Sequence, residues 1–100
     1  MSIQVKEDDD VVTITVQGDI EIYTLDEFKK VLISVGHSSD KNIVIDVSKV
    51  NFIDSSGIGA LISLYKLQSK KGRKLTIRNA SPDIQNILKL TTLSDVLGLE

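Results

Sequence analysis

The sequence has no cysteine and no tryptophan, and only one proline and one histidine. Without cysteine, neither a disulfide framework nor a thiolate zinc site can form. No apolar run approaches the ~20 residues that a membrane-spanning helix needs. There is no cluster of basic residues, and the net charge is −2, which argues against nucleic acid as the main partner. We therefore expect no direct nucleic-acid partner and no membrane contact.

What is present suits one domain. The 100 residues are 41% hydrophobic and 26% charged, which is typical of a soluble globular protein with a single core. The chain turns acidic at Glu7 to Asp10, and such a start does not fit a secretory signal. We expect one domain over residues 1–100 and a cytoplasmic location.

The first part of the chain predicts a hairpin followed by a helix. Apolar residues alternate with polar ones over residues 3–6 and again over 12–17, with an acidic loop at Asp8 to Asp10 between them. Thr24 followed by Glu27 fits a capping box, so a helix should begin there. Gly36 is the expected C′ residue that ends this helix.

The rest of the chain continues with strands and helices in turn. Residues 42–48 and 75–78 alternate as strands do, and Gly72 ends a helix between them. Ser81-Pro82-Asp83 opens another helix, and 92–97 suggests a last short one. The order is β-β-α-β-α-β-α-α. Because nearly every strand has one apolar and one polar face, we predict an α/β fold with a mixed sheet and helices mainly on one face. A doubly wound, flavodoxin-like sheet fits less well.

The stretch from Val50 to Tyr65 predicts a strand end, a tight turn and the start of the central helix. Asp54, Ser55 and Ser56 are all residue types that cap helix N-termini. Gly57 and Gly59 follow, and each lowers helix stability by roughly 0.5–1 kcal/mol relative to alanine. This suggests that something approaches the backbone closely there. A helix N-terminus also favours an anion, including a phosphate carried by a serine.

The central helix carries two apolar stripes where a surface helix needs one. The stripe expected to face the sheet consists of Ile58, Leu61, Ile62 and Tyr65. The second stripe, roughly opposite, consists of Ala60, Leu64 and Leu67. Two interpretations remain open for the second stripe: a neighbouring helix covers it, or it is a partner-binding face beside the Ser55 turn.

Residues Phe52 to Gly59 resemble the signature of anti-sigma factor antagonists, the STAS domain family. The resemblance extends over most of the chain. Gly18 to Glu21, with Thr24, is similar to the family's segment after the second strand. Residues 43–48 are similar to its central strand, and 79–90 to its Ser-Pro helix. The resemblance implies a single STAS-like domain over residues 1–100.

The resemblance implies a partner-switching protein and not an enzyme. Family members bind an anti-sigma factor that is also a serine kinase, and so regulate sigma-factor-dependent transcription. The kinase phosphorylates the serine after the motif aspartate, which is Ser55 here, and a serine phosphatase restores the active form. Ser56 is the rival acceptor. No cofactor and no metal is expected. The implied partner-binding residues are Asp19, Glu21, Thr24, Asp54, Ser55, Ser56, Gly57, Gly59, Leu64 and Leu67.

The chain departs from the family pattern at two positions. Glu21 stands where aspartate is usual, and Thr92 where glycine is frequent. Neither touches the phosphoacceptor.

Other functions compete with the partner switch. The chain could be a STAS scaffold, or a module of another signalling complex that binds a small ligand or nucleotide, although no P-loop or G-x-G-x-x-G is present. The three residues Asp54 to Ser56 could simply cap a helix. Hydrolase chemistry is poorly supported, because a serine nucleophile needs a base. The single histidine, His37, is expected to be a solvated loop residue.

Overall fold

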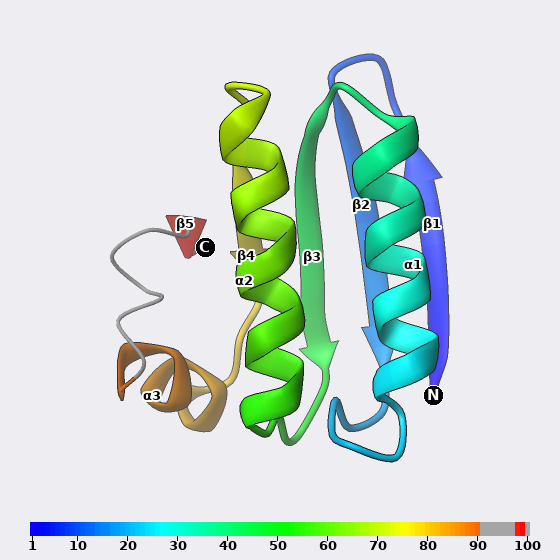
Figure 1. The fold of residues 1–100 in the computed structure, drawn as a ribbon. Coiled ribbons are helices and arrows are strands. Elements are labelled where there is room, and N and C mark those ends of the chain that lie inside the picture. The colour runs from blue at the N-terminus through cyan, green and yellow to red at the C-terminus, as the bar shows by residue number, and fades with distance from the viewer. Residues whose placement is uncertain (91–97, 100) are drawn as a thin grey trace.

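The computed structural model describes residues 1–90 and 98–99, which form a mixed sheet with helices mainly on one face (Figure 1). In chain order the elements are β1 (Ser2–Glu7), β2 (Val11–Gln17), α1 (Leu25–Ser38), β3 (Asn42–Lys49), α2 (Ser55–Lys70), β4 (Leu75–Arg78), α3 (Pro82–Leu90) and β5 (Gly98–Leu99). The predicted α/β fold is confirmed. The helix expected at 92–97, and Thr92 with it, lie outside the described residues. The two-residue strand β5 was not predicted.

The strands lie in the sheet in the order in which they occur in the chain, β1-β2-β3-β4-β5. β1 pairs antiparallel with β2, which confirms the hairpin. The pairs β2·β3, β3·β4 and β4·β5 are parallel. In this register Ile14, Ile45 and Ile77 lie side by side across the sheet, and each is at most 1% exposed.

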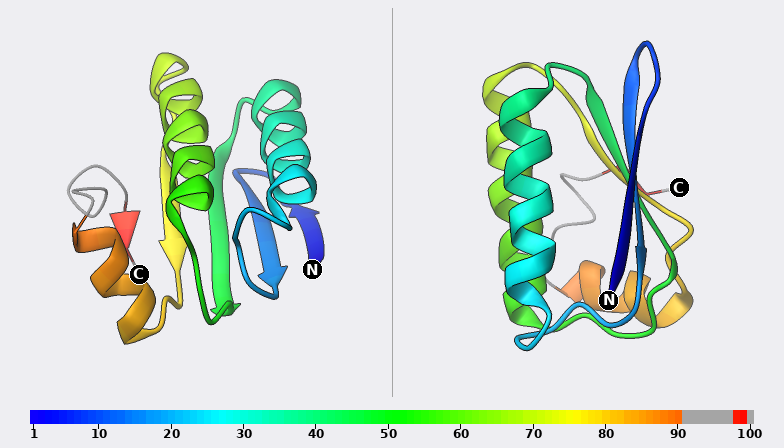
Figure 2. Two further views of the ribbon diagram at one scale, coloured as in Figure 1. Left: turned by 60° about the horizontal axis from the view of Figure 1, so that its bottom comes forward. Right: turned by 90° about the vertical axis from the view of Figure 1, so that its right-hand side faces the viewer.

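The hydrophobic core lies between the sheet and the two long helices. α1 and α2 run side by side over one face, and no helix of the described residues covers the other face (Figure 2). The alternation in β2 explains this arrangement. Val12, Ile14 and Val16 are buried under the helices, whereas Thr13 and Thr15 on the other face are partly exposed. None of the helices in the described residues is long and apolar enough to cross a bilayer.

Helix α1 differs from expectation at both ends. Thr24 is at the N-cap position but forms no capping bond, because its hydroxyl is bound within the preceding loop. Gly36 does not end the helix, which continues to Ser38. A Cβ atom on Gly36 would lie 2.6 Å from Leu67 Cδ2, so this glycine allows close packing of α1 against α2.

The second apolar stripe of α2 is mostly covered by α1. Ala60 and Leu64 are 6% and 3% exposed, which supports the first interpretation for these two residues. Leu64 therefore belongs to the core. The prediction that Leu64 is exposed and binds a partner is contradicted by its burial. Its neighbour on the stripe, Leu67, is partly exposed. The predicted helix at Ser81 is confirmed: the Ile84 N–H donates to Ser81 Oγ at 3.2 Å.

The C-terminal end of α2 is fastened to the surrounding loops by side chains. Gln68 is fully buried, and its Nε2 donates to the carbonyl oxygens of Lys41 at 3.0 Å and Lys74 at 3.1 Å. Lys71 Nζ donates to the carbonyl oxygen of Ser39 at 2.8 Å and also to that of Gly36. These bonds satisfy carbonyl groups at the end of α1 and before β3 and β4.

Candidate functional site

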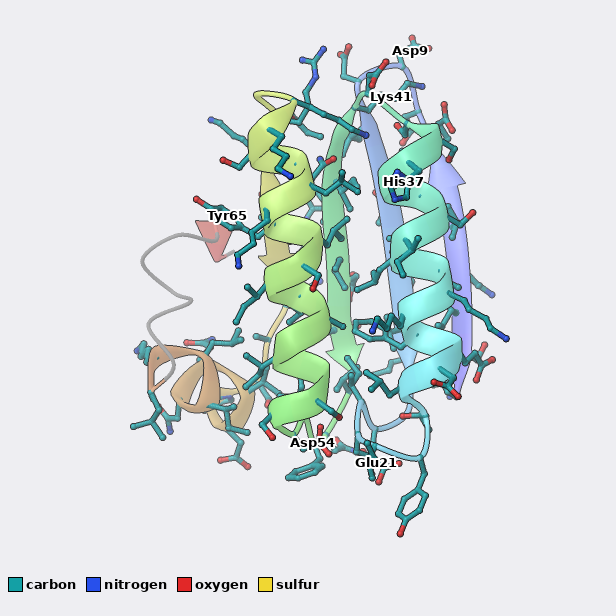
Figure 3. The ribbon with its side chains drawn as sticks, viewed as in Figure 1. Asp9, Glu21, His37, Lys41, Asp54 and Tyr65 are labelled. Carbon is teal, nitrogen blue, oxygen red and sulfur yellow. The ribbon has the colours of Figure 1, made fainter. Side chains whose placement is uncertain are left out.

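Two loops meet at the opposite end of α2, and we call this region the Ser55 corner (residues 18–24 and 50–59). The Ile20 N–H donates to the Phe52 carbonyl at 2.9 Å, and the Asp54 N–H donates to the Ile20 carbonyl at 3.0 Å. These bonds extend the parallel pairing of β2 and β3 past the strand ends, with a bridge between Ile20 and Ile53. Figure 3 shows Glu21 and Asp54 at this same end of the molecule.

Asp54 holds the corner together. Its Oδ1 accepts from the N–H groups of Ser56 at 2.9 Å and Gly57 at 3.1 Å, which caps α2. The other oxygen, Oδ2, accepts from the Ile22 N–H at 3.0 Å and so ties in the β2–α1 loop. The Ser56 hydroxyl and the N–H groups of Gly57, Ile22 and Ser56 hold the pKa of the Asp54 carboxyl below its usual range. The cap predicted from the sequence is confirmed for Asp54.

The two serines have different surroundings. The Ser56 hydroxyl donates to Asp54 Oδ1 at 2.5 Å, and this residue is partly buried. Ser55 is exposed in the first turn of α2, and its hydroxyl makes no hydrogen bond to another residue in the described part of the chain. Ser55 thus presents an accessible hydroxyl, whereas that of Ser56 is already engaged.

The two glycines also differ. A Cβ atom on Gly57 would lie 2.5 Å from Ile20 Cγ2 and 2.9 Å from Ile53 Cγ1, so the predicted close approach at Gly57 is made by the protein's own loops. A Cβ on Gly59 would meet nothing within 4 Å. The fold described here therefore gives no packing reason for glycine at position 59.

The remaining predicted residues shape the β2–α1 loop. The Thr24 hydroxyl donates to the Asp19 carbonyl at 2.7 Å and accepts from the Glu21 N–H at 3.1 Å. The Glu21 carboxylate accepts from the Tyr23 N–H at 3.1 Å. Glutamate at this position therefore folds back onto its own loop, and Asp19 is exposed beside it.

Three exposed apolar residues at the corner were missed from the sequence. Ile22, Tyr23 and Phe52 are 60%, 91% and 48% exposed. Grouped exposed apolar side chains often mark an interaction site. The signal was present, because all three fall outside the periodic apolar positions of the predicted strands and helices.

The structure brings most of the predicted site residues together. Those at the corner are Asp19, Glu21, Thr24, Asp54, Ser55, Ser56, Gly57 and Gly59. Leu64 and Leu67 lie further along α2, against α1. His37 is exposed in the last turn of α1 and not in a loop, at the end of the molecule away from Asp54 (Figure 3). Within the described residues, no group of histidine and carboxylate side chains could hold a metal ion.

Comparisons with known proteins agree with this architecture. A family model described as the STAS domain matches residues 2–100. An anti-sigma-B factor antagonist of Staphylococcus aureus is 24% identical over 97 residues, covering 97% of this chain and 90% of that protein.

Solved structures share the fold. A crystal structure of an anti-sigma factor antagonist from Mycobacterium paratuberculosis has a TM-score of 0.85 at 25% identity, covering 98% of this chain and 83% of that one. The Bacillus cell fate determinant SpoIIAA in its phosphorylated form has a TM-score of 0.76 at 15% identity, covering 99% of this chain and 91% of that one.

Proposed function

The chain belongs to the STAS domain family, and from that premise we propose that it is an anti-sigma factor antagonist switched by phosphorylation of Ser55. In this proposal the unmodified protein binds an anti-sigma factor that is also a serine kinase. The kinase then phosphorylates Ser55, the complex dissociates, and a serine phosphatase restores binding. The relatives named as anti-sigma factor antagonists support the class of partner.

The observation that carries the proposal is the contrast between the two serines. Ser55 is exposed with an unengaged hydroxyl, whereas the Ser56 hydroxyl is bound to Asp54. A kinase must reach the hydroxyl oxygen, so Ser55 is the better acceptor. A phosphate on Ser55 would also stand at the N-terminus of a 16-residue helix, where its charge is stabilised. The fold should therefore survive the modification.

The surroundings of Ser55 explain how a phosphate would release a partner. Ile22, Tyr23 and Phe52 are exposed on the two loops that meet at the same corner, and aromatic residues often dominate binding energy. A phosphate adds ≈ −1.5 to −2 charges, and burying it unpaired in such an interface costs several kcal/mol. That is enough to dissociate a complex of micromolar affinity.

The first test is to identify the modified residue. Wild type, Ser55→Ala and Ser56→Ala are incubated with the anti-sigma factor kinase and ATP, and the phosphate is located by mass spectrometry. We expect modification of wild type and Ser56→Ala but not of Ser55→Ala. Continued modification of Ser55→Ala, with none on Ser56→Ala, would move the switch to Ser56. If no variant is modified, the scaffold or ligand-binding function replaces this one.

The second test separates a switch from a helix cap. Ser55→Ala should bind the kinase like wild type, whereas Ser55→Asp should bind at least tenfold more weakly, because an interfacial charge costs more than about 1.4 kcal/mol. Thermal stability is the control, since aspartate suits the first turn of a helix. Equal binding of both variants would show that Ser55 has no switching role.

A further inference from the structure

A second site lies away from the Ser55 corner, in the groove between α1 and α2. The two helices run side by side (Figure 1), and residues of both line the groove. The groove has a volume of about 250 Å³. Its apolar floor consists of Leu32, Ile33, Ala60, Leu64 and Leu67. Leu32, Ala60 and Leu64 are at most 6% exposed, whereas Ile33 is 47% exposed and Leu67 is partly exposed. The apolar surface open to a ligand therefore comes mainly from Ile33 and Leu67.

The rim of the groove is positively charged. Lys29, Lys66 and Lys70 line it together with His37, and no acidic residue does. None of the three lysines forms an ion pair or hydrogen bond with another residue in the described part of the chain. Three uncompensated ammonium groups around an apolar floor stand out in a chain whose net charge is −2.

The positive charge is concentrated at one end of the groove. The two helices run in the same direction (Figure 1), and Gly36 packs against Leu67. His37 and Lys66, the neighbours of this pair in sequence, line the same end, and Lys70 lies one turn beyond Lys66. Lys29 is seven residues before Gly36, which is about 10 Å along α1.

We propose that this groove binds a short aliphatic carboxylate, with its head group at Lys66 and Lys70 and its chain along the floor towards Lys29. The size of the groove, about 250 Å³, supports a small ligand, since it is below the range of about 300–1,000 Å³ for drug-sized ligands. The apolar floor would take the hydrocarbon chain, and the unpaired ammonium groups would take the carboxylate.

Octanoate is the probe, and binding is followed by amide chemical shifts of the intact protein. We expect saturable shifts confined to α1 and α2. The double variant Lys66→Gln/Lys70→Gln should bind about tenfold more weakly, since one exposed ion pair contributes up to about fivefold. Lys29→Gln should have a smaller effect. Lys30→Gln is the matched control, because Lys30 is exposed on the same helix but does not line the groove, and it should bind like wild type.

A second pair of variants tests the cavity itself. Ser63 is exposed at the groove, so Ser63→Phe should fill it and abolish binding. Ser69→Phe places the same side chain on the same helix outside the groove and should have no effect. Octanol binding as tightly as octanoate would overturn the proposal, as would shifts that do not saturate or binding that Ser63→Phe leaves unchanged. Ser55→Asp should bind octanoate like wild type, so this result is independent of the partner switch.

Discussion

The two ends of helix α2 use their polar groups in opposite ways. At the C-terminal end, Gln68 and Lys71 donate to carbonyl groups of neighbouring loops, and Gln68 is fully buried. At the N-terminal end, Asp54 makes the internal bonds, while Ser55 and three apolar side chains remain exposed. The comparison indicates that one end fastens the fold and the other presents a surface. Substitutions of Gln68 and Lys71 at the first should change stability, and substitutions of the exposed residues at the second should change binding.

The largest effect on stability should come from Leu64→Asp. Leu64 is 3% exposed between α1 and the core, so the change buries an unpaired charge. We expect a loss of about 4 kcal/mol or more in the free energy of unfolding, measured with denaturant. The control is Ser63→Asp on the exposed side of the same turn, which should change stability by no more than about 0.5 kcal/mol. A small effect of Leu64→Asp on stability would instead indicate that Leu64 belongs to a partner-binding face.

Gln68→Ala should have the next largest effect. It removes the donor for two carbonyl groups, those of Lys41 and Lys74, and leaves space in the core. We expect a loss of about 3 kcal/mol, read from chemical unfolding. Ser69→Ala, at the adjacent exposed position, should be close to neutral. If the two variants lost similar amounts of unfolding free energy, Gln68 would not fasten this end of α2, and the contrast between the two ends would be wrong.

The two glycines at the N-terminal end should respond in opposite directions. Gly57→Ala forces a Cβ into Ile20 and Ile53 and should destabilise the protein by about 2 kcal/mol. Gly59→Ala meets open space and should stabilise it by about 0.5–1 kcal/mol through helix propensity. If a partner approaches α2 closely, Gly59→Ala should also weaken partner binding. A more stable variant that binds normally would exclude Gly59 from the interface.

The smallest effect concerns pH. The bonds to Asp54 lower its pKa in the folded state, whereas an unfolded aspartate titrates near pH 3.9. Between these values the unfolded chain binds more protons, so stability rises with pH there. This contribution is complete above about pH 4 and is lost as pH falls through the lowered pKa.

Acid unfolding of Asp54→Asn measures that contribution, because the variant lacks the titrating group and its stability should depend less on pH below 4. Asp46→Asn is the comparison. Burial raises the pKa of Asp46, but hydrogen bonds from Ser48 and Asn79 and the charge of Arg78 outweigh this effect, so the pKa lies below its usual range. An unaltered pH dependence in Asp54→Asn would show that the carboxylate does not strengthen the corner.

Periodic patterns predicted most of the fold. The alternation of Val12, Ile14 and Val16 identified both the strand and its buried face. The Asp-Ser-Ser turn identified the start of α2. Gly36 was misinterpreted because a glycine near a helix end looks the same whether it terminates the helix or admits a neighbouring side chain. The contact of Gly36 with Leu67 joins residues from different helices, and local sequence does not contain it.

The candidate site was predicted in outline but not in detail. Its residue types suggested a capped turn with a serine beside it. Which serine has an unengaged hydroxyl depends on the direction of the Ser56 side chain towards Asp54, which is a property of three-dimensional geometry. The same holds for the bond between Ile22 and Asp54, because it spans 32 positions of the chain.

The order of the strands has a consequence for how the molecule assembles. Each parallel pairing closes a crossover that contains a helix, since Val11 pairs with Asn42 and Ile43 pairs with Leu75, and the chain entropy lost there slows folding. Each strand nevertheless pairs with the one that precedes it in the chain, so every pairing needs only the next strand to have been made. The sheet can therefore grow from β1 towards β5 in the direction of synthesis, with α1 and α2 docking as each parallel strand is added.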